Sequence, residues 1–420
     1  MNNDQLFWFL HNNYVYLDNA ASTPPFKSVM EKVLSFMRNY GSIHRGAGIL
    51  SELTTQQYEE ARQAIMKFVN ANPTRDAVVF TTNTTDSINR LALMYPWKPG
   101  DKVLTSDIEH SANSLPWCKV SQIEVCPTND DLEIELDILE KVIKKDKAIK
   151  VIALAGTSNI TGKTIPVKSI YNICKRYGVD LFIDASQMAP HHPIDMNYCD
   201  AVSFSGHKMY APFGGGVLAA RKSILSHTGQ APTGGGNVIY YTPDYKPVYQ
   251  EVPRNHEIGT QNGVGAVSIA TAAKTLMEIG WDNIENHDKK MHGWMIKHLS
   301  DVPNIRLHFP QPNHETSIAI FDTPTVSPVT VGNYLSRHRI GVRVGTFCVY
   351  RLIEKLKKLS SPHTLIKKIA TNNKSLPDEY LLLRASSGLM NTEKDVITLA
   401  NKLREVTSQS PPTKVGGMMP

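Results

Sequence analysis

The stretch "FSGHKMYAPFGGG" (204–216) places one lysine, Lys208, between a short apolar run and a glycine-rich turn. Upstream, "LFIDASQ" (181–187) ends another apolar run on a carboxylate, Asp184. A lysine is seldom buried without a partner, because its ammonium group is strongly hydrated. Alone, such a lysine would lie with its stem on apolar surface and its head in water, and such an aspartate would cap a helix. The surrounding sequence decides whether the two act together.

Short apolar runs rich in β-branched residues alternate with segments of helical period from residue 76 onward. The runs are nearly continuous in hydrophobic residues, as expected for strands covered on both faces of a sheet. The alternation predicts an α/β fold with a mostly parallel seven-stranded sheet. Ligands of such sheets lie beyond the carboxyl ends of the strands, where Asp184 and Lys208 both fall. The predicted strands cover 76–82, 101–107, 121–127, 150–156, 180–186, 200–207 and 216–222.

The hydrophobic pattern changes near residue 275, where a helical stretch leads into alternating strands and further helices. At 420 residues the chain is long enough for a large domain and a smaller one, each with its own core. We predict a large domain (31–275) and a small α+β domain (276–407), with an N-terminal segment (1–30) that packs with the small domain. Residues 408–420 have the composition of a disordered tail.

Composition excludes several classes of protein. The chain is 41% hydrophobic and 20% charged with a formal net charge of +6, and it has no basic block of the kind that nucleic-acid binding needs. It has no apolar run of about 18 residues that would span a membrane, and its N-terminus lacks the basic region of a signal peptide. The five cysteines are scattered without a CxxC pair, which favours a reducing compartment over disulfides or a zinc site. We therefore predict a cytoplasmic protein without a metal.

Asp184 and Lys208 follow neighbouring predicted strands, so their side chains are expected at one edge of the sheet. In a cleft of low dielectric a lysine loses its proton more readily and becomes a nucleophile toward aldehydes. A nearby carboxylate can hold a pyridinium nitrogen protonated. These two groups are what pyridoxal 5′-phosphate (PLP) needs. Gln187 would then reach the phenolic oxygen of the cofactor, although it also suits an ordinary turn.

A phosphate site is expected where "TTNTTDSINRLA" (81–92) follows a strand and opens a helix. The free N–H groups of a helix N-terminus bind anions, and the hydroxyls of Thr84 and Thr85 lie there. A plain helix N-cap explains these residues equally well. Ser205 and His207, which flank the lysine, are further candidate phosphate donors.

His110 follows another predicted strand within "DIEHSANSLPW" (107–117). Its imidazole could stack on the cofactor ring, although any single one of the fifteen histidines is more often structural. Several predicted strands are each followed by a candidate PLP residue, and polar groups gathered at strand ends are typical of functional sites. This agreement supports a PLP site more strongly than His110 does alone.

The chain resembles the class V aminotransferase-fold enzymes, and most closely the group II cysteine desulfurases and selenocysteine lyases. The resemblance runs from about residue 15 to about residue 405 and implies a fold-type I PLP-dependent transferase that forms a homodimer. The motifs occur in the order seen in that family, and the GHK segment with its upstream DxxQ is the most specific. They are "YLDNAASTP" (16–24), "SIHRGAG" (42–48), "TNTTDSIN" (82–89), "IEHSAN" (108–113), "TSNITG" (157–162), "DASQ" (184–187), "SGHKMYAPFGGG" (205–216) and "EIGTQNGVGA" (257–266).

The resemblance implies a role for each cofactor residue. Lys208 would form the Schiff base, Asp184 would pair with the pyridinium nitrogen, and His110 would stack on the ring. Asn159 and Gln187 would bond the phenolic oxygen. The phosphate would be held by Thr85, Ser205 and His207, and by Thr260 of the neighbouring subunit.

The resemblance also assigns the substrate contacts. Arg384, in "LLLRASSGLMNTEKDV", aligns with the arginine that binds the substrate α-carboxylate. A guanidinium binds a carboxylate through two parallel hydrogen bonds, which lysine cannot do. Arg45 and Asn159 are expected to contact the substrate as well. The alternative for Arg384 is a surface arginine in a strand.

Cys348 lies in "GVRVGTFCVYRL" (341–352), which resembles the R-x-G-x-x-C loop whose cysteine attacks the substrate sulfur. Thr346 and Phe347 stand where group II desulfurases usually carry histidines, and the Phe-Cys pair also resembles the desulfurase domain of molybdenum-cofactor sulfurases. The long segment 354–380 that follows is expected to shield a persulfide or to present it to an acceptor protein. The other four cysteines are predicted to be packing residues.

The sequence therefore predicts a PLP-dependent cysteine desulfurase that converts L-cysteine to L-alanine. Lys208 would remove the Cα proton and Cys348 would take the sulfur as a persulfide. A selenocysteine lyase, a C–S lyase, an epimerase of the same fold or a molybdenum-cofactor-sulfurase-like enzyme stays open. A nucleotide-binding oxidoreductase is disfavoured, because no G-x-G-x-x-G opens a helix after the first strand. A scaffold protein would have no reason to keep the lysine, aspartate and arginine together.

Overall fold

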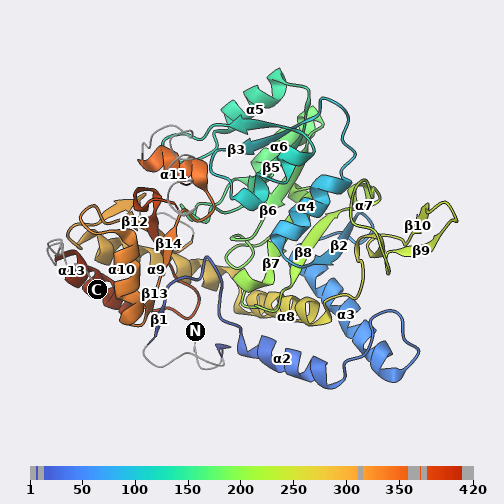
Figure 1. Cartoon of the computed structure of the whole chain (residues 1–420), viewed down its shortest axis with the longest axis horizontal. Coiled ribbons are helices and arrows are strands. Elements are labelled where there is room, and N and C mark those ends of the chain that lie inside the picture. Colours follow the sequence, from blue (N-terminus) through green and yellow to red (C-terminus); the bar gives the residue numbers. More distant parts are fainter. Residues whose placement is uncertain (1–5, 8–13, 311–315, 358–368, 370–375, 409–420) are drawn as a thin grey trace, which may run out of the picture. The chain divides into compact units, whose positions relative to one another are not determined.

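The computed structural model describes residues 6–7, 14–310, 316–357, 369 and 376–408, and two compact units make up the chain (Figure 1). Unit 1 comprises Met1–Phe9, Ala20–Asn159 and Lys163–Glu285, and unit 2 comprises Leu10–Asn19, Ile160–Gly162 and Asn286–Pro420. The predicted tail lies outside the described residues from position 409 onward, as do 358–368 and 370–375 of the long segment after Cys348.

The unit boundaries differ from the predicted domains at two places. Of the predicted N-terminal segment 1–30, only Leu10–Asn19 belongs to unit 2. Residues from Ala20 onward bond within unit 1, where the Ala20 carbonyl accepts a hydrogen bond from Gln187. The second boundary lies after Glu285 instead of residue 275: the helix Gly263–Ile279 lies wholly in unit 1, and the next helix, Trp281–Ser300, crosses the boundary.

A seven-stranded sheet forms the centre of unit 1, with the strand order β2-β8-β7-β6-β5-β3-β4 (Figure 1). Only β8 runs antiparallel to its neighbours, so the predicted mostly parallel sheet is confirmed. Most of its strands are buried along most of their length, as a sheet covered on both faces requires. They are β2 (Asp76–Thr81), β3 (Lys102–Ser106), β4 (Gln122–Cys126), β5 (Ile149–Ala155), β6 (Asp180–Asp184), β7 (Ala201–Ser205) and β8 (Gly216–Arg221).

Helices follow most strands of unit 1 and end at recognisable signals. α4 begins after Asn83, whose side chain accepts a hydrogen bond from the Asp86 N–H. α6 ends at Gly178, which adopts the left-handed conformation with φ of 68°. The helices are α2 (Lys27–Arg38), α3 (Ile49–Phe68), α4 (Thr84–Met94), α5 (Leu136–Lys145), α6 (Val167–Tyr177), α7 (Lys222–Leu225) and α8 (Gly263–Ile279), with a hairpin of β9 (Val238–Tyr241) and β10 (Pro247–Tyr249).

Unit 2 is built on a four-stranded antiparallel sheet with the order β11-β12-β15-β14. Its core gathers buried side chains such as Leu17, Phe321 and Leu399 from the strands and from helices on that sheet. Its elements are β1 (Val15–Tyr16), β11 (Arg306–His308), β12 (Ile318–Asp322), α10 (Pro328–Arg337), β13 (Ile340–Gly341), β14 (Arg343–Gly345), α11 (Tyr350–Lys357), β15 (Leu382–Ser386) and α13 (Glu393–Ser408), and α9 (Trp281–Ser300) crosses the boundary. Within the described part of the chain, no helix has the length and apolar character needed to cross a membrane.

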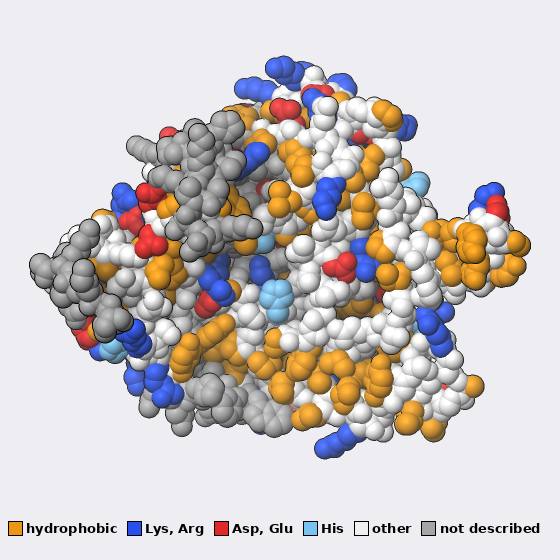
Figure 2. Space-filling model, in the orientation of Figure 1, with side chains coloured by type: hydrophobic (Ala, Val, Ile, Leu, Met, Phe, Trp, Pro, Cys, Tyr) orange, Lys and Arg blue, Asp and Glu red, His pale blue; other side chains and the backbone are white. Residues whose placement is uncertain are grey.

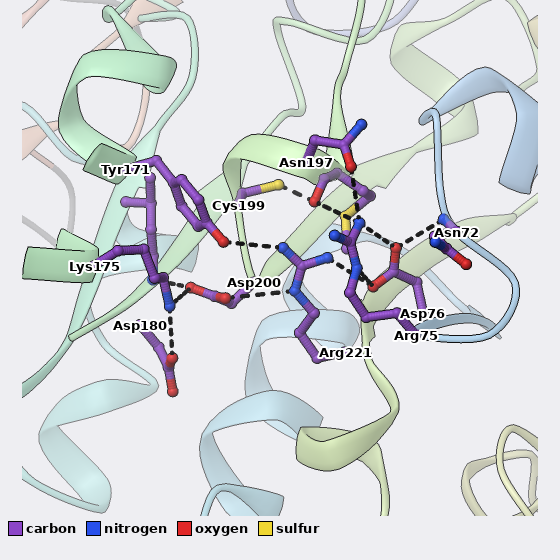
Figure 3. A network of polar contacts seen from close by, with 12 residues as sticks. Asn72, Arg75, Asp76, Tyr171, Lys175, Asp180, Asn197, Cys199, Asp200 and Arg221 are labelled. Carbon is purple, nitrogen blue, oxygen red and sulfur yellow. Dashed lines mark hydrogen bonds and ion pairs between the residues drawn. The ribbon is translucent and has the colours of Figure 1, made fainter. Parts of the chain in front are cut away.

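Charged side chains gather at the edge of the large sheet where β6 and β7 begin and β8 ends (Figure 3). Arg221 Nη1 lies 2.7 Å from Asp76 Oδ1, and Arg221 Nε lies 3.5 Å from Asp200 Oδ1. Lys175 Nζ lies 2.8 Å from Asp200 Oδ2 and 3.2 Å from Asp180 Oδ1. The opposite charges of these side chains pair with one another. Ion pairs therefore occupy the edge of the sheet that lies opposite the carboxyl ends of its parallel strands.

Replacing Asp76 by asparagine should destabilise the fold, because it leaves Arg75 and Arg221 without their buried carboxylate. Burial opposes ionisation of Asp76, but hydrogen bonds from both arginines outweigh it and lower its pKa. We expect a loss on the order of 3–5 kcal/mol. A lowered pKa stabilises the fold above the unfolded value, so this contribution disappears as the pH falls below about 4. Urea unfolding at a series of pH values should therefore show a weaker acid dependence in Asp76→Asn than in wild type.

Asp146→Asn is the matched control, since Asp146 also binds a cation, Lys102, but at the surface. It should change the free energy of unfolding much less. Equal losses in the two variants would contradict a special role for the buried pair.

Candidate active site

Lys208 and Asp184 lie at the same edge of the large sheet. β6 and β7 pair in parallel, with Asp184 opposite Ser203. Asp184 ends β6 and is buried, and Lys208 ends the short 3₁₀ helix Gly206–Lys208 that follows β7 directly. The Ser186 N–H donates to Asp184 Oδ1 at 2.9 Å, which fixes the orientation of the carboxylate.

Hydroxyl groups cluster at the N-terminus of α4, beside this edge. Thr84 donates its N–H to Ser205 Oγ at 2.6 Å, and its own Oγ1 lies 2.6 Å from the same atom. Ser186 Oγ donates to Thr84 Oγ1 at 2.8 Å. Thr85, the next residue, is exposed. Ser186 was not among the predicted residues, although it lies inside the "DASQ" motif.

Hydrogen bonds join the segment 20–23, which is part of the "NAAST" motif, to residues near Lys208. Gln187 Nε2 donates to the Ala20 carbonyl at 2.6 Å, and the Thr23 N–H donates to the His207 carbonyl at 2.8 Å. The Tyr210 N–H donates to Thr23 Oγ1 at 2.6 Å. These bonds hold the backbone on both sides of the lysine.

Two imidazoles belong to the same edge of the sheet. Burial, and then the positive charge of Lys208, lower the pKa of His207 to about 4, so this ring is neutral at pH 7 and can donate one N–H. His110 accepts a hydrogen bond from the Ala112 N–H at Nδ1, at 3.1 Å. A neutral His110 ring therefore carries its proton on Nε2.

Glu109 lies directly before His110 and is buried. Its carboxyl group accepts hydrogen bonds from Ser106 Oγ at 2.7 Å, Asn113 Nδ2 at 2.8 Å and the Ala155 N–H at 2.8 Å. Burial raises the pKa of Glu109 to about 7, against the hydrogen bonds from Asn113 and Ser106 that lower it. The contacts with Ser106 and Ala155 tie the His110 loop to the ends of β3 and β5. Glu109 was not among the predicted residues, although it lies in the "IEHSAN" motif.

The remaining predicted residues of unit 1 differ in exposure. Asn159 is buried after β5, whereas Thr260 is exposed in the loop before α8. Arg45 is also exposed, and its Nη2 donates to the carbonyl of Gly259, next to Thr260, at 3.0 Å. This hydrogen bond joins the loop of Arg45 to the loop of Thr260.

Arg384 lies on β15 in unit 2 and is 3% exposed. Its Nη2 lies 3.5 Å from Asp18 Oδ1, and Arg343 binds the other oxygen of Asp18 at 2.7 Å. Burial lowers the pKa of Arg384 to about 10, which Asp18 opposes and Arg343 reinforces, so the guanidinium stays charged at neutral pH. Its central carbon lies 4.9 Å from the centre of the Phe347 ring. Asp18, which is part of "YLDNAAS", was not among the predicted residues.

Cys348 is exposed in the turn between β14 and α11. Phe347 and Cys348 have φ angles of 53° and 59°, in the left-handed region that non-glycine residues seldom adopt. The predicted packing role holds for Cys126, Cys174 and Cys199, which are buried, but it is wrong for Cys118. Cys118 lies in the short 3₁₀ helix Trp117–Lys119, where the neighbouring Trp117 takes the buried position.

Comparison with known proteins places this geometry in a family. Residues 15–399 match the model of the family described as aminotransferase class-V. The chain belongs to this family. A probable cysteine desulfurase from Halalkalibacterium halodurans is 32% identical over 93% of this chain and 92% of its own length. A second probable cysteine desulfurase, from Streptomyces coelicolor, is 33% identical over 80% of this chain and 83% of its own.

Solved structures agree with this assignment. The crystal structure of the cysteine desulfurase CsdA (S-sulfonic acid) from Escherichia coli has a TM-score of 0.82 and 27% identity, covering 96% of this chain and 98% of that one. The apo structure of a cysteine desulfurase from Thermococcus onnurineus also has a TM-score of 0.82, with 28% identity over 94% and 95% of the two chains. The class V chain therefore has the predicted fold-type I architecture, and its family is PLP-dependent.

The residues present in unit 1 fit PLP. An amine and a carboxylate on neighbouring strands suit the aldehyde and the ring nitrogen of the cofactor. The buried hydroxyls of Thr84, Ser186 and Ser205 at a helix N-terminus suit its phosphate. Across the described ranges, no three His, Cys, Asp or Glu side chains are grouped to hold a metal ion.

The five cysteines should react with a thiol probe in two classes. Cys348 and Cys118 are exposed, whereas burial raises the pKa of Cys126 to about 11 and of Cys174 to about 12. Since the thiolate is the reactive form, we expect fast labelling of Cys348 and Cys118 only. Peptide mapping before and after unfolding in guanidinium measures this, and rapid labelling of Cys126, Cys174 or Cys199 in the folded chain would contradict the burial described here.

Proposed function

We propose that this class V enzyme is a cysteine desulfurase that converts L-cysteine to L-alanine and takes the sulfur on Cys348. One observation carries the proposal: the ring of Phe347 packs against the buried guanidinium of Arg384, and Phe347 is the residue before Cys348. A group that can bind a carboxylate is thereby tied to an exposed thiol within unit 2. This is the pair that a reaction on the side chain of cysteine needs.

PLP would be held by the residues of unit 1. Lys208 would bind its aldehyde carbon, Asp184 its ring nitrogen, and Asn159 and Gln187 its phenolic oxygen. His110 would stack on the ring. The phosphate would be bound by Thr84, Thr85, Ser186, Ser205 and His207. When bound, PLP delocalises the electron pair that is left after the Cα proton is removed.

The side chains of this chain would carry out the remaining steps. Arg384 binds the substrate carboxylate through two hydrogen bonds, and Arg45 approaches the same substrate. Lys208 removes the Cα proton as a general base. The thiolate of Cys348 attacks the substrate sulfur, so a sulfur–sulfur bond forms while the bond from that sulfur to Cβ breaks. The electron pair of the broken bond is protonated at Cβ and a proton returns to Cα, which gives alanine. His110 is a candidate acceptor for the Cys348 proton.

We further propose that two copies of the chain form the active dimer. Hydrophobic side chains cover the β9–β10 hairpin (Figure 2), where Tyr245 is 82% and Ile239 65% exposed. α2 and α3 also expose Leu34 and Ile49. Apolar surface of this kind is typical of an interface. Within such a dimer, the exposed Thr260 would reach the phosphate bound by the partner copy.

The sulfur on Cys348 must pass to an acceptor, which we propose is a second protein. The exposure of Cys348 supports direct transfer from its persulfide. A cytoplasmic location is part of the proposal as well. It is supported by the five cysteines, all of which are free thiols in the structure.

Cys348→Ser should abolish formation of the protein-bound persulfide while leaving PLP binding intact. Serine nearly preserves the shape of cysteine but is hardly ionised and is a poor nucleophile toward sulfur. The measurement supplies L-cysteine, quantifies alanine, and maps persulfide by peptide labelling. Cys118→Ser is the matched control because it removes the other exposed thiol, and it should behave as wild type.

Lys208→Ala completes this experiment. It should remove the visible absorbance of the bound cofactor and stop all turnover. Full release of alanine and sulfide by Cys348→Ser would favour a lyase that needs no protein thiol. A colourless wild-type protein after incubation with PLP would overturn the proposed function altogether.

Arg384→Lys should raise KM for cysteine strongly and leave the cofactor spectrum unchanged. Lysine keeps the charge but loses the two-point contact with a carboxylate. The loss of such a contact in a buried site costs about 2–5 kcal/mol. Steady-state kinetics with L-cysteine, and then with L-selenocysteine, measure the effect. An unchanged KM would place the substrate carboxylate elsewhere.

A further inference from the structure

An unbroken set of polar contacts joins three segments of unit 1 that are far apart in the sequence. His44 Nε2 lies 2.7 Å from Glu59 Oε1, and Arg62 Nε donates to Glu59 Oε2 at 2.9 Å. Arg62 also binds both oxygens of Glu257, with Nη1 at 2.7 Å and Nη2 at 3.0 Å. We call His44, Glu59, Arg62 and Glu257 the polar chain. It runs from the loop before α3, across that helix, to the loop before α8.

The two ends of the polar chain meet again through Arg45. Arg45 follows His44 directly, and its Nη2 donates to the carbonyl of Gly259 at 3.0 Å, two positions after Glu257. Gly236 leaves room for this contact, since a Cβ there would stand 2.0 Å from Arg45 Nη2. The polar chain and the Arg45 contact therefore form a closed circuit that includes both loops.

The circuit is anchored on the open edge of the large sheet. β2 is the outermost strand and pairs only with β8 within the sheet. On its free side the Val78 carbonyl accepts a hydrogen bond from Arg62 at 2.6 Å, and the Phe80 N–H donates to Glu257 at 3.2 Å. The ion pair thus satisfies two backbone groups that a further strand would otherwise bind. Its position is fixed by the rigid sheet.

The loops that the circuit joins carry two residues of the proposed site. Arg45 is the candidate for approaching the substrate, and Thr260 is the candidate phosphate ligand of the partner copy. Both are exposed, and an exposed side chain on a loop has little of its own to hold it in place.

We propose that Arg62 is a positioning residue, which through Glu257 and Glu59 holds the Arg45 loop and the Thr260 loop in one fixed arrangement for substrate and cofactor. This inference rests on the proposed function, because that function assigns the Arg45 loop to the substrate and the Thr260 loop to the cofactor phosphate. Arg62 itself is 4% exposed and acts only through its carboxylate partners. Its planar guanidinium serves two carboxylates and a backbone carbonyl at once, which the single ammonium group of lysine cannot match.

The outer part of the polar chain supports this role. Burial opposes ionisation of Glu59, but hydrogen bonds from His44 and Arg62 outweigh it and lower its pKa to about 2. Glu59 is therefore a carboxylate at every pH at which the enzyme would work. His44 needs that contact, because its φ of 64° places it in the left-handed region. If the pair of Arg62 with Glu257 served only the stability of the fold, neither the contact of His44 with Glu59 nor that of Arg45 with Gly259 would be needed.

The test compares Arg62→Met with Arg221→Met in the PLP-loaded protein. Arg221 is the matched control: it is 8% exposed, binds Asp76 at 2.7 Å, and belongs to the network at the strand ends opposite the carboxyl ends of the parallel strands (Figure 3). Both variants remove one buried guanidinium and should lower Tm. Only Arg62→Met should then release PLP about tenfold faster and lower kcat/KM for cysteine about a hundredfold. PLP release is followed as the loss of visible absorbance after dilution.

A milder pair keeps the proposal testable should Arg62→Met fail to fold. His44→Gln and Glu59→Gln weaken the polar chain at its half-exposed end, and each should speed PLP release and raise KM about threefold with little change in Tm. Equal PLP release in Arg62→Met and Arg221→Met, or unaltered release and KM in both milder variants, would overturn the inference alone. A wild-type chain that takes up no PLP would overturn the proposed function and this inference with it.

Discussion

Parallel pairing of β6 with β7 is the interaction on which the arrangement of unit 1 depends. It sets Asp184 opposite Ser203, so the backbone that leaves β7 must carry Lys208 past the carboxylate. The glycines after the lysine allow the next strand to return closely. A Cβ on Gly216 would stand 2.5 Å from the backbone nitrogen of Asn83, the N-cap of α4. Gly216 therefore lets the helix N-terminus approach β8, the strand that follows the lysine.

The two edges of this sheet use charge in opposite ways. At the edge of Arg221 and Asp76, oppositely charged side chains pair directly and the network is complete without a ligand. At the other edge, hydroxyl groups contact one another around Thr84, and the charges belong to Lys208 and Asp184. Because a complete ion-pair network gains nothing from a further charge, stability is concentrated at one edge and binding chemistry at the other.

Much of the fold could be predicted, because the sequence patterns that define its strands and turns each span only a few neighbouring residues. Most strands of the large sheet are short apolar runs, and the turn residues after them identify the sheet edge. The placement of Lys208 and Asp184 at that edge followed from these runs. The contribution of Ser186 did not, since its partner Thr84 is distant in the sequence and only the folded sheet brings the two together. The same holds for the ion pair of Asp18 with Arg384, which joins residues at opposite ends of the chain.

The errors have a physical reason of the same kind. A helical pattern shows that a segment is helical but not which unit it packs with, so the boundary after Glu285 could not be read from periodicity. Exposure of Cys118 depends on the neighbouring Trp117 occupying the buried position. The role that we propose for Arg62 could not be predicted from the sequence either, because an arginine on an amphipathic helix is usually solvated. Its importance depends on Glu257, which reaches it only after the chain has crossed the whole sheet and returned to the open edge of β2. Residues that act through such distant partners can be found only from the folded structure.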